Sequence, residues 1–497
     1  MSILPSISTL QASRQPFVPE TLHPGKHPWW RSLVLGLLLL LSVAVYVLLI
    51  EVAPKQRLGP VTLFTQVWIF SLLPYFGASA FILLTKPFEG RWRWIELGII
   101  FMGAFVFRAM LLPLTPILSN DSWRYLWDAR VFLHGYSPYV TVPNDPVLLP
   151  LRDLQIYWQM AYREVPTIYP PGALYIYTLS YLLAPSNLYF LKAIFLVCDM
   201  VTCALLAVLL ARKGLDARRV IIYAWSPLPI VEFAVQGHVD VVSITLTVLA
   251  VLCAASTRRG SRALTGFLIA IATLIKIYPI LMLVVVVRRR DWPLLATCVV
   301  TIVLAYTPFL ILGHGQAFGY FSTYADQQGT SAGVVQLVTF QLGQNLGFNL
   351  ANILLLQHIV DVLVIAFMSL VVWALRLFKQ ISMEAATLIL FGTVFAISSH
   401  VLPWYTPALL IWIVLLPGRL WTKQGPSASG LAVAVTWYFT WASLFGYFIP
   451  VFQSWSPYYL FVYDVVIVGL AIGLTLGVRG ELKQLYRMTL EGKPKPS

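Results

Sequence analysis

The chain has 497 residues, of which 59% are hydrophobic and only 11% are charged, whereas a soluble domain carries roughly a quarter charged residues. Stretches of about 20 apolar residues, enough to cross a hydrocarbon core of roughly 30 Å, recur from Ser32 almost to the C-terminus. This composition excludes an ordinary soluble protein. The formal net charge of +14 could indicate a nucleic-acid partner, but the positions of the basic residues favour the positive-inside bias of membrane proteins. We therefore expect a membrane bilayer, and no nucleic acid, as partner.

The N-terminal segment, residues 1–31, is expected to be a cytoplasmic tail. Its first 28 residues are polar, contain prolines and are too long and too weakly basic for a signal-peptide n-region. The apolar run that follows is long enough to span, so we expect an uncleaved anchor. The four cysteines all lie in apolar runs and predict no disulfide framework: Cys198, Cys203, Cys253 and Cys298.

Apolar runs separated by polar breaks predict an all-α polytopic membrane protein with about twelve transmembrane helices between residues 32 and 478. Residues 479–497 are expected to form a cytoplasmic basic tail. The spans are expected near residues 32–50, 61–84, 94–118, 187–211, 219–236, 238–255, 292–313, 349–375, 383–399, 401–417, 429–449 and 457–478.

The distribution of lysine and arginine predicts the orientation of these spans. With a cytoplasmic N-terminus, most of the 34 basic residues fall in inner segments, as the positive-inside rule requires. Both termini are then cytoplasmic. The basic residues expected on the outer side are Lys55, Arg57, Arg124, Arg130, Arg152 and Arg163.

Two apolar segments must then fail to cross the membrane. Residues 172–184 are too short, and counting them as a span would move the basic cluster at 212–219 to the outside, so we expect an interfacial or re-entrant segment. Residues 263–287 have basic clusters at both ends and Lys276, Tyr278 and Pro279 in the middle. This pattern predicts two re-entrant half-helices, and such broken helices survive where they line a cavity or are buried in protein.

The first long outer loop, residues 119–171, opens with NDSWRYLWDARVFLHGYSPY, Asn120 to Tyr139. On a helix, Asp121, Arg124, Tyr125 and Asp128 share one arc, while the opposite arc carries Trp123, Leu126, Trp127 and Leu133. We expect an outer-face amphipathic helix whose two tryptophans anchor it in the headgroups, with an Arg124–Asp128 pair one turn apart. The alternative is an N-cap followed by an ion-paired surface helix.

Other polar residues gather at the same predicted face. Asp121, Tyr169, His238, Asp240 and His400 all fall at the outer boundary, whereas the inner loops carry no glycine-rich phosphate loop. The second outer loop, residues 314–348, is rich in amide, hydroxyl and aromatic side chains, which is typical of a carbohydrate-binding lid and also of any mobile polar loop.

Five ordered motifs resemble those of GT-C glycosyltransferases, and most of all bacterial polyprenyl-phosphate-mannose-dependent mannosyltransferases similar to glycosyltransferase family 87. They cover roughly residues 90–420. A departure is that two spans precede the unit formed by the third span and the acidic loop. The motifs are DSWRYLWDARVFLHGYSPY, IYPP at 168–171, EFAVQGHVD at 232–240, LIKIYP at 274–279 and SSHVLPWY at 398–405.

The resemblance implies a GT-C-like bundle and an inverting transfer in which Asp121 is the general base. A carboxylate suits this role because a sugar hydroxyl is a poor nucleophile. The departing lipid phosphate requires preorganised cations, and the candidates are Arg124, Arg130, Lys276 and His400, with Lys276 and Arg130 favoured. The candidate substrate-binding residues are Asp128, Tyr139, Tyr169, His238, Asp240, Tyr278 and Trp404.

Structural alternatives exist for several of these residues. Lys276 could pair with an intramembrane acid, for which the candidates are Asp199, Glu232, Asp361 and Asp464. Trp404 and Tyr405 could belong to an interfacial aromatic belt. His238, Asp240 and His400 could converge on zinc, but no local ligand spacing supports a metal site.

The sequence thus predicts an integral membrane hexosyltransferase, with mannose as the expected sugar, that acts on the non-cytoplasmic face of the bacterial inner or plasma membrane. Its donor would be a polyprenyl-phosphate sugar and its acceptor a glycolipid or polysaccharide. No cofactor or metal is expected, since the lipid-linked sugar phosphate is a substrate. The alternatives are a lipid or small-molecule transporter or flippase, for which we find no internal repeat, and a non-catalytic scaffold.

Overall fold

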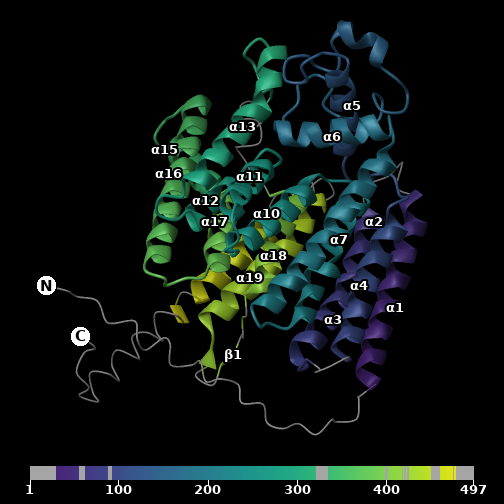
Figure 1. The fold of residues 1–497 in the computed structure, drawn as a ribbon, viewed down its shortest axis with the longest axis vertical. Helices are drawn as coiled ribbons and strands as arrows, with labels where there is room; N and C mark the ends of the chain where they lie inside the picture. The colour runs from purple at the N-terminus through teal and green to yellow at the C-terminus, as the bar shows by residue number, and fades with distance from the viewer. Residues whose placement is uncertain are drawn as a thin grey trace, which may run out of the picture.

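The computed structural model describes residues 29–54, 62–87, 92–320, 334–397, 401–416, 418, 421–422, 425–448, 459–473 and 475–476. The predicted C-terminal tail, most of the N-terminal tail and His400 lie outside these residues. Within them the fold is all-helical, apart from an antiparallel pairing of β1 (Trp421–Thr422) with β2 (Gly425–Pro426). Most helices run side by side in one bundle, with α5 and α6 above one end of it (Figure 1).

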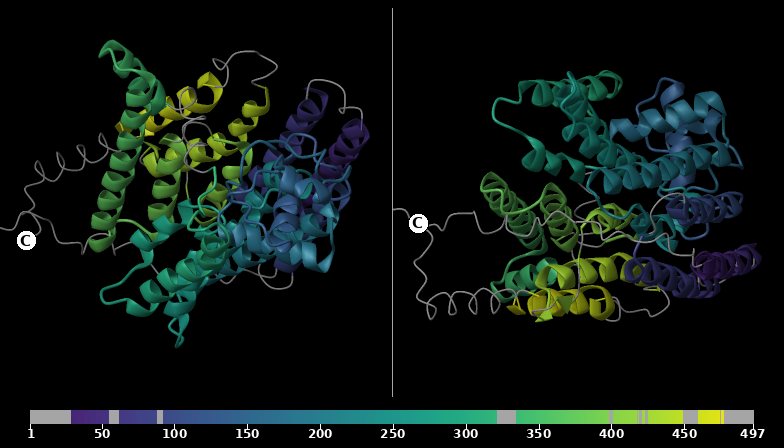
Figure 2. Two further views of the ribbon diagram at one scale, coloured as in Figure 1. Left: turned by 90° about the horizontal axis from the view of Figure 1, so that it is seen from above. Right: turned by 60° about the horizontal axis from the view of Figure 1, so that its bottom comes forward.

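Seven apolar helices of the described residues are long enough to cross a membrane. Each coincides with a predicted span. Figure 2 shows α1–α4 and α15–α16 on opposite sides of the molecule. The long helices are α1 (Trp29–Val52), α2 (Thr62–Phe70) continued by α3 (Leu72–Leu84), α4 (Trp92–Leu111), α7 (Leu188–Arg212), α13 (Trp292–Leu312), α16 (Leu350–Leu377) and α19 (Ala428–Ala442) continued by η7 (Ser443–Phe448).

The predicted number of about twelve spans is not confirmed, because the remaining apolar helices are shorter. Four predicted spans fall on such helices: α10 (Asp240–Ala254), α17 (Met383–Ile397), η6 with α18 (Pro403–Tyr405, Pro407–Leu415) and Phe461–Gly473, which overlaps the π-helix η8 (Tyr459–Asp464). The helix α15 (Val334–Asn345) was not expected to span and packs against α16.

The remaining predicted span, residues 219–236, is broken into three short helices. These are η4 (Ala217–Val220), α8 (Ile221–Ala224) and α9 (Pro227–Ala234). The prediction of one continuous helix is wrong here because Pro227 lacks an N–H and forces Ser226 into an extended conformation. Side chains of other helices satisfy the freed carbonyls, which makes a break tolerable at membrane depth. Trp68 donates to Pro227 O at 3.1 Å, Tyr75 to Ile222 O at 2.7 Å and Arg108 to Ala224 O at 2.7 Å.

The segment after α10 forms a hairpin made of α11 (Ser261–Thr273), a turn at 274–277, η5 (Tyr278–Leu281) and α12 (Met282–Val286). Its two ends are clasped together: Arg262 forms an ion pair with Asp291 and donates to Val286 O at 2.8 Å, and Arg288 donates to Ala254 O at 3.1 Å. The chain therefore enters and leaves at the same end of the bundle, as the predicted re-entrant hairpin requires, with Lys276 at its turn.

The same end of the bundle, which we call the basic end, joins several helix termini through ion pairs. Glu96 at the start of α4 contacts Arg31 of α1 at 3.3 Å and Arg218 at 2.5 Å. Lys213, after α7, pairs with Glu384 of α17 at 2.6 Å. These helix termini thus lie at the same end of the bundle. The distribution of lysine and arginine in the sequence predicts the same arrangement.

The helix α5 (Asp121–Leu133) lies at the opposite end and is buried, so the predicted headgroup-anchored helix is wrong. Trp127 is fully covered and packs on Tyr157 at 5.2 Å between ring centroids. The cover comes from the outer loop itself, which includes η3 (Pro146–Leu151). On another side, α6 (Pro171–Leu183) stacks Tyr177 on Tyr125 of α5 at 4.3 Å.

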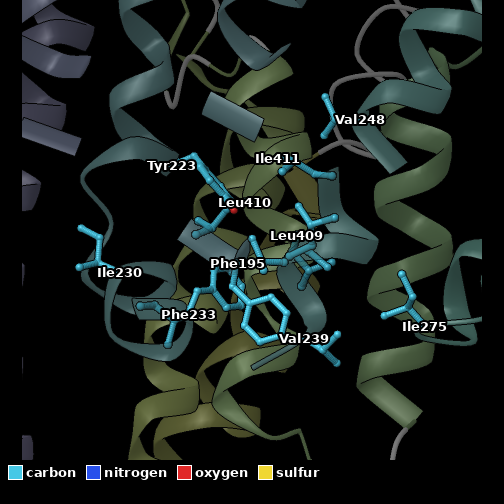
Figure 3. Close-up of a cluster of buried hydrophobic side chains, with 14 of the residues drawn as sticks. Phe195, Tyr223, Ile230, Phe233, Val239, Val248, Ile275, Leu409, Leu410 and Ile411 are labelled. Atoms are coloured by element: carbon cyan, nitrogen blue, oxygen red, sulfur yellow. The ribbon is translucent and has the colours of Figure 1, made fainter. Parts of the chain in front are cut away.

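A hydrophobic core formed by α7, α8, α9, α10 and α18 supports the ends of these short helices (Figure 3). Phe195, Tyr223, Phe233 and Leu410 in this core are all buried. Val239 and Ile275 belong to the same core, and their sequence neighbours His238, Asp240 and Lys276 extend it into a polar cluster.

Candidate active site

The connection between α9 and α10 positions the centre of the polar cluster. Gly237 adopts a φ of +72°, and a Cβ at this position would lie 3.1 Å from Lys192 Cγ and 3.3 Å from Ser122 Cβ. The left-handed turn and the close approach both require glycine. The adjoining Gln236 side chain accepts hydrogen bonds from the backbone N–H groups of Ile117 and Leu118 at 2.9 Å. The turn is thereby tied to the segment that leads into α5.

Asp121 is the first residue of α5, and its side chain retains 25% exposure. Its Oδ2 lies 4.0 Å from His238 Nδ1, and its backbone N–H donates to Ser119 Oγ at 3.2 Å. Burial raises the pKa of the Asp121 carboxyl, while the charge of Lys276 and the hydroxyls of Tyr169 and Ser119 act in the opposite direction. The result is a carboxylate that is more basic than an ordinary aspartate and still accessible.

Lys276 lies at the turn of the hairpin and keeps 17% side-chain exposure. Its Nζ is 3.1 Å from Oδ1 of the fully buried Asp240 and 4.6 Å from the centroid of the Tyr405 ring. The alternative that Lys276 pairs with an acid is therefore realised, but the acid is Asp240, which had been predicted to bind substrate. A buried carboxylate and an aromatic face together compensate the ammonium at a hairpin break.

His238 lies behind Asp121 and is fully buried. Its ring stacks on Trp404 with centroids 4.0 Å apart and an interplanar angle of 10°, and its Nε2 is 3.3 Å from Glu232 Oε2. Tyr447 of η7 donates to the Glu232 carboxylate at 3.0 and 3.2 Å. The structure thus brings Asp121, His238 and Trp404 together.

Sequence reasoning missed Glu232 and Tyr447 as members of the cluster. An acid within an apolar run, six residues before His238, was an available signal for Glu232, although it was considered only as a partner for Lys276. Tyr447 lies 215 residues further along the chain, where no local pattern distinguishes it from other interfacial aromatic residues.

Arg130 is not brought into the cluster. Its guanidinium donates to Tyr181 Oη at 3.0 Å, Leu151 O at 2.7 Å and Ser186 Oγ at 3.0 Å, and it also pairs with Asp153. These contacts occupy all three guanidinium nitrogens, so the structure gives Arg130 a role in folding the outer loop, in place of the predicted contact with phosphate.

Arg124 is committed in a similar way. It donates to Asp128 Oδ1 at 2.7 Å, which realises the predicted pair one turn apart, and to the carbonyls of Tyr162 at 2.7 Å and Val165 at 3.0 Å. Asp128 is buried beneath this guanidinium. Both residues therefore hold the loop 162–165 beside Asp121. The second oxygen of Asp128, Oδ2, has no hydrogen-bond partner within the described residues, but it is buried.

The three predicted tyrosines differ in their surroundings. The Tyr169 hydroxyl favours the ionised form of the Asp121 carboxyl. The Tyr139 hydroxyl donates to the backbone carbonyl of Tyr169 at 2.7 Å and so helps to hold Tyr169 in place. Tyr278, two residues beyond Lys276, is in contact with Phe391 and Phe395 at 4.8 and 5.3 Å between ring centroids. His400 lies outside the described residues.

The described part of the chain contains no group of three or more His, Cys, Asp and Glu side chains arranged to hold a metal ion. The groups of the cluster that keep access to the surface include one carboxylate, Asp121, and one ammonium, Lys276. This arrangement can accept a proton at one atom and bind an anion at another.

Residues 167–403 match the model of glycosyltransferase family 87. The match includes Tyr169, Glu232, His238, Asp240 and Lys276 and begins after Asp121. It confirms the predicted resemblance to this family and, together with the apolar helices, indicates a multi-pass membrane glycosyltransferase. No curated protein has a sequence that matches this chain.

Proposed function

We propose that this protein transfers a hexose, with mannose as the expected sugar, from a polyprenyl-phosphate donor to a glycolipid or polysaccharide acceptor, with inversion at the anomeric carbon. The observation that carries this proposal is the presence of an accessible carboxylate, Asp121, and an accessible ammonium, Lys276, in one polar cluster at one end of a membrane bundle.

In the proposed reaction Asp121 acts as general base. The acceptor hydroxyl attacks the anomeric carbon of the donor sugar while its proton passes to the Asp121 carboxylate. The bond between the anomeric carbon and the phosphate oxygen breaks on the opposite face of the ring. The raised pKa of Asp121 suits this task, because a more basic carboxylate holds the transferred proton more tightly.

Lys276 is the proposed binding group for the departing phosphate. The lipid phosphate leaves as a stable anion, which requires positive charge and no protonation, so the chemistry requires no metal or cofactor. Asp240 holds the ammonium in place at 3.1 Å, and a second anion can still approach because the Lys276 side chain stays partly exposed. A lysine at a hairpin break between membrane helices suits a donor that arrives from the bilayer.

The acceptor is proposed to approach past Tyr162. This residue is held in the left-handed conformation, φ 57°, while Arg124 binds its carbonyl, and its side chain is 68% exposed. An exposed aromatic ring beside the base provides a face for a sugar ring. In this proposal the basic end of the bundle faces the cytoplasm of a bacterial inner or plasma membrane, and the site faces outward.

Replacement of Asp121 by Asn tests the proposal. We expect transfer from radiolabelled polyprenyl-phosphate mannose to a membrane extract, measured with purified protein in proteoliposomes, to fall by about 10²- to 10⁴-fold, because an amide cannot take the proton. Polyprenyl-phosphate glucose and arabinose serve as competing donors.

The matched control is Glu164→Gln, which changes an exposed acid of the same loop whose carboxylate contacts Asn144. This variant should transfer at the wild-type rate. Undiminished labelling by Asp121→Asn would remove Asp121 from its proposed role, and transfer from one of the other two donors alone would change the assigned sugar.

A further inference from the structure

The first outer loop presents two exposed aromatic rings on the approach to the proposed base. Trp158 is 59% exposed and Tyr162 is 68% exposed. Desolvation raises the pKa of the Tyr162 hydroxyl, and interactions with Asp121 and Tyr320 raise it further, so this hydroxyl lies within electrostatic range of Asp121. Trp158 lies four residues earlier in the same loop.

Trp158 is held in place by an arginine. The guanidinium of Arg163 lies over the rings of Trp158 and Tyr157, 4.9 and 5.0 Å from their centroids, and donates to Trp158 O at 2.8 Å. The Trp158 and Tyr157 rings also meet edge to face, with centroids 5.4 Å apart. Because Arg163 directly follows Tyr162, these contacts keep Trp158 close to the segment that carries Tyr162.

The loop beneath the two exposed rings is fixed by further contacts. Tyr157 is buried and donates to Asn144 Oδ1 at 2.5 Å. The backbone N–H of Asn144 donates to Arg163 O at 3.0 Å, and Arg124 binds the carbonyl of Tyr162. The two rings are therefore already ordered before a ligand arrives, which lowers the entropic cost of binding.

The neighbours of Trp158 suit a sugar. A sugar ring presents apolar C–H groups on its faces and hydroxyls around its edge, so it fits an aromatic face flanked by polar donors. Trp158 has this environment, since its ring contacts the Arg163 guanidinium and the next residue, Gln159, is exposed. The other common use of an exposed tryptophan at a membrane surface is contact with lipid headgroups, and the variants below separate the two.

We propose that Trp158 binds a sugar unit of the acceptor that lies away from the reacting hydroxyl, so that the acceptor carries an oligosaccharide chain. This inference rests on the proposed function. The terminal sugar lies against Tyr162 beside Asp121, and the chain continues outward to Trp158. Four residues of backbone reach at most about 14 Å, a separation that a short oligosaccharide bridges. The two rings thereby select acceptors by length.

Replacement of Trp158 by Ala in the full-length protein tests this assignment. In proteoliposomes with radiolabelled polyprenyl-phosphate mannose, the amount of membrane extract that gives half-maximal transfer should rise by about 5- to 30-fold, because one aromatic contact with the acceptor is lost. The maximal rate and the donor KM should stay near the wild-type values, since Trp158 does not touch the reacting atoms.

Two further variants distinguish a sugar from a lipid contact. Trp158→Leu keeps an apolar side chain but no aromatic face, so it should lose acceptor affinity as Trp158→Ala does. Leu154→Ala is the matched control, because it changes another exposed apolar residue of the same loop, and it should behave as the wild type. The labelled glycan released from the wild-type product and sized by chromatography should be longer than a disaccharide.

The inference would be overturned by a folded Trp158→Ala protein with an unchanged requirement for extract, or by a labelled product no longer than a disaccharide. Equal losses in Trp158→Ala and Leu154→Ala, or wild-type behaviour of Trp158→Leu, would assign the ring to lipid. If Trp158→Ala fails to fold, the acceptor requirement of Trp158→Leu decides.

Binding without donor separates this inference from the proposed function. The glycoconjugate fraction of the membrane extract should bind Trp158→Ala more weakly than the wild type, as measured by thermophoresis of the purified proteins. A wild-type protein that shows this difference but transfers no sugar from polyprenyl-phosphate donors would contradict the proposed function and leave the acceptor site in place. Equal binding by the two proteins would contradict the acceptor site.

Discussion

The surroundings of Asp121 influence the pKa of its carboxyl in opposite directions. Its position at the N-terminus of α5 places it where the helix dipole favours negative charge, and Lys276 and the Tyr169 hydroxyl favour the ionised form as well. Burial outweighs these contributions and raises the pKa. The Asp121 carboxylate is therefore a stronger base than that of an ordinary aspartate, which suits a residue that takes up a proton.

The pH dependence of transfer should reflect this balance. The ionised carboxylate is the active form, so activity is present above the pKa of Asp121 and is lost as the pH falls through it. Because the pKa is raised, the loss should begin at a higher pH than for an ordinary aspartate. Lys276→Gln removes a charge that lowers this pKa, so the acid limb of kcat/KM should move to still higher pH, beyond the drop in rate itself. An unshifted limb would mean that Asp121 is not the group that titrates.

Arg130 should matter for stability more than for substrate binding. Lysine cannot reproduce its contacts with Tyr181, Leu151 and Ser186, so Arg130→Lys should lower the free energy of unfolding by about 1–3 kcal/mol. Thermal unfolding in detergent measures this loss, and the donor KM of the folded protein should stay near the wild-type value. A KM that rises steeply with unchanged thermal stability would return Arg130 to phosphate binding.

Among the elements, short interrupted helices place the reactive groups, and the long helices surround them. The Gly237 turn joins α9 to α10, and the hairpin turn carries Lys276. Both interruptions expose polar backbone at membrane depth, which is tolerated because protein surrounds it. The site is thus built where the regular helical pattern stops.

Gly237→Ala tests the turn. Both Gly237 and the control position Gly214 have positive φ, 72° and 68°, but an added Cβ at Gly214 meets nothing within 4 Å. Gly214→Ala should therefore cost only the conformational strain of about 1–2 kcal/mol. Gly237→Ala adds crowding against Lys192 and Ser122, so it should destabilise the protein more, as measured by thermal unfolding, and should also lower transfer by displacing His238. Equal losses in both variants would contradict this role of the turn.

Sequence reasoning located most elements but misjudged two of them, each for a physical reason. Apolar runs identify membrane helices because a helix that crosses the hydrocarbon core must be apolar along its length. The run at 219–236 is equally apolar but is broken, and the break is tolerated because side chains far away in the sequence, Trp68, Tyr75 and Arg108, donate hydrogen bonds to its carbonyls. The α5 helix looks amphipathic, but the residues that cover Trp127 belong to the loop after it.

At the scale of the whole molecule, the candidate site was partly predictable. Ionisable residues in apolar segments are costly, so they mark candidate functional positions in the sequence. Four such residues are Asp121, His238, Asp240 and Lys276, and the predicted orientation of the spans placed all four toward the outer end of the bundle. The assignment of Arg124 and Arg130 to phosphate could not be judged from sequence, since carbonyl acceptors such as Tyr162 O and Leu151 O leave no pattern in the residue types.

The proposed orientation predicts opposite accessibility for two exposed positions. Leu154 in the outer loop and Arg259 before the hairpin are both exposed, and a cysteine at each can be introduced after the four native cysteines are replaced. A membrane-impermeant maleimide applied to intact cells should label Leu154→Cys and should label Arg259→Cys only after the membrane is opened. Labelling of both from one side would refute the arrangement of the two ends.

Because the two ends of the hairpin are held together at the basic end, the length of its helices limits how far the turn with Lys276 can lie from that end. The 15 residues of α10 and the 13 residues of α11 rise only about 22 and 20 Å from the basic end, which is less than a hydrocarbon core of roughly 30 Å. In the proposed orientation, with the basic end at the inner lipid surface, Asp240 and Lys276 would lie several ångströms below the outer one. To reach that depth, a sugar nucleotide dissolved in water would have to lose part of its hydration. The headgroup of an isoprenoid-linked donor already lies at the lipid surface and would move only a few ångströms. A thinner bilayer would shorten that distance.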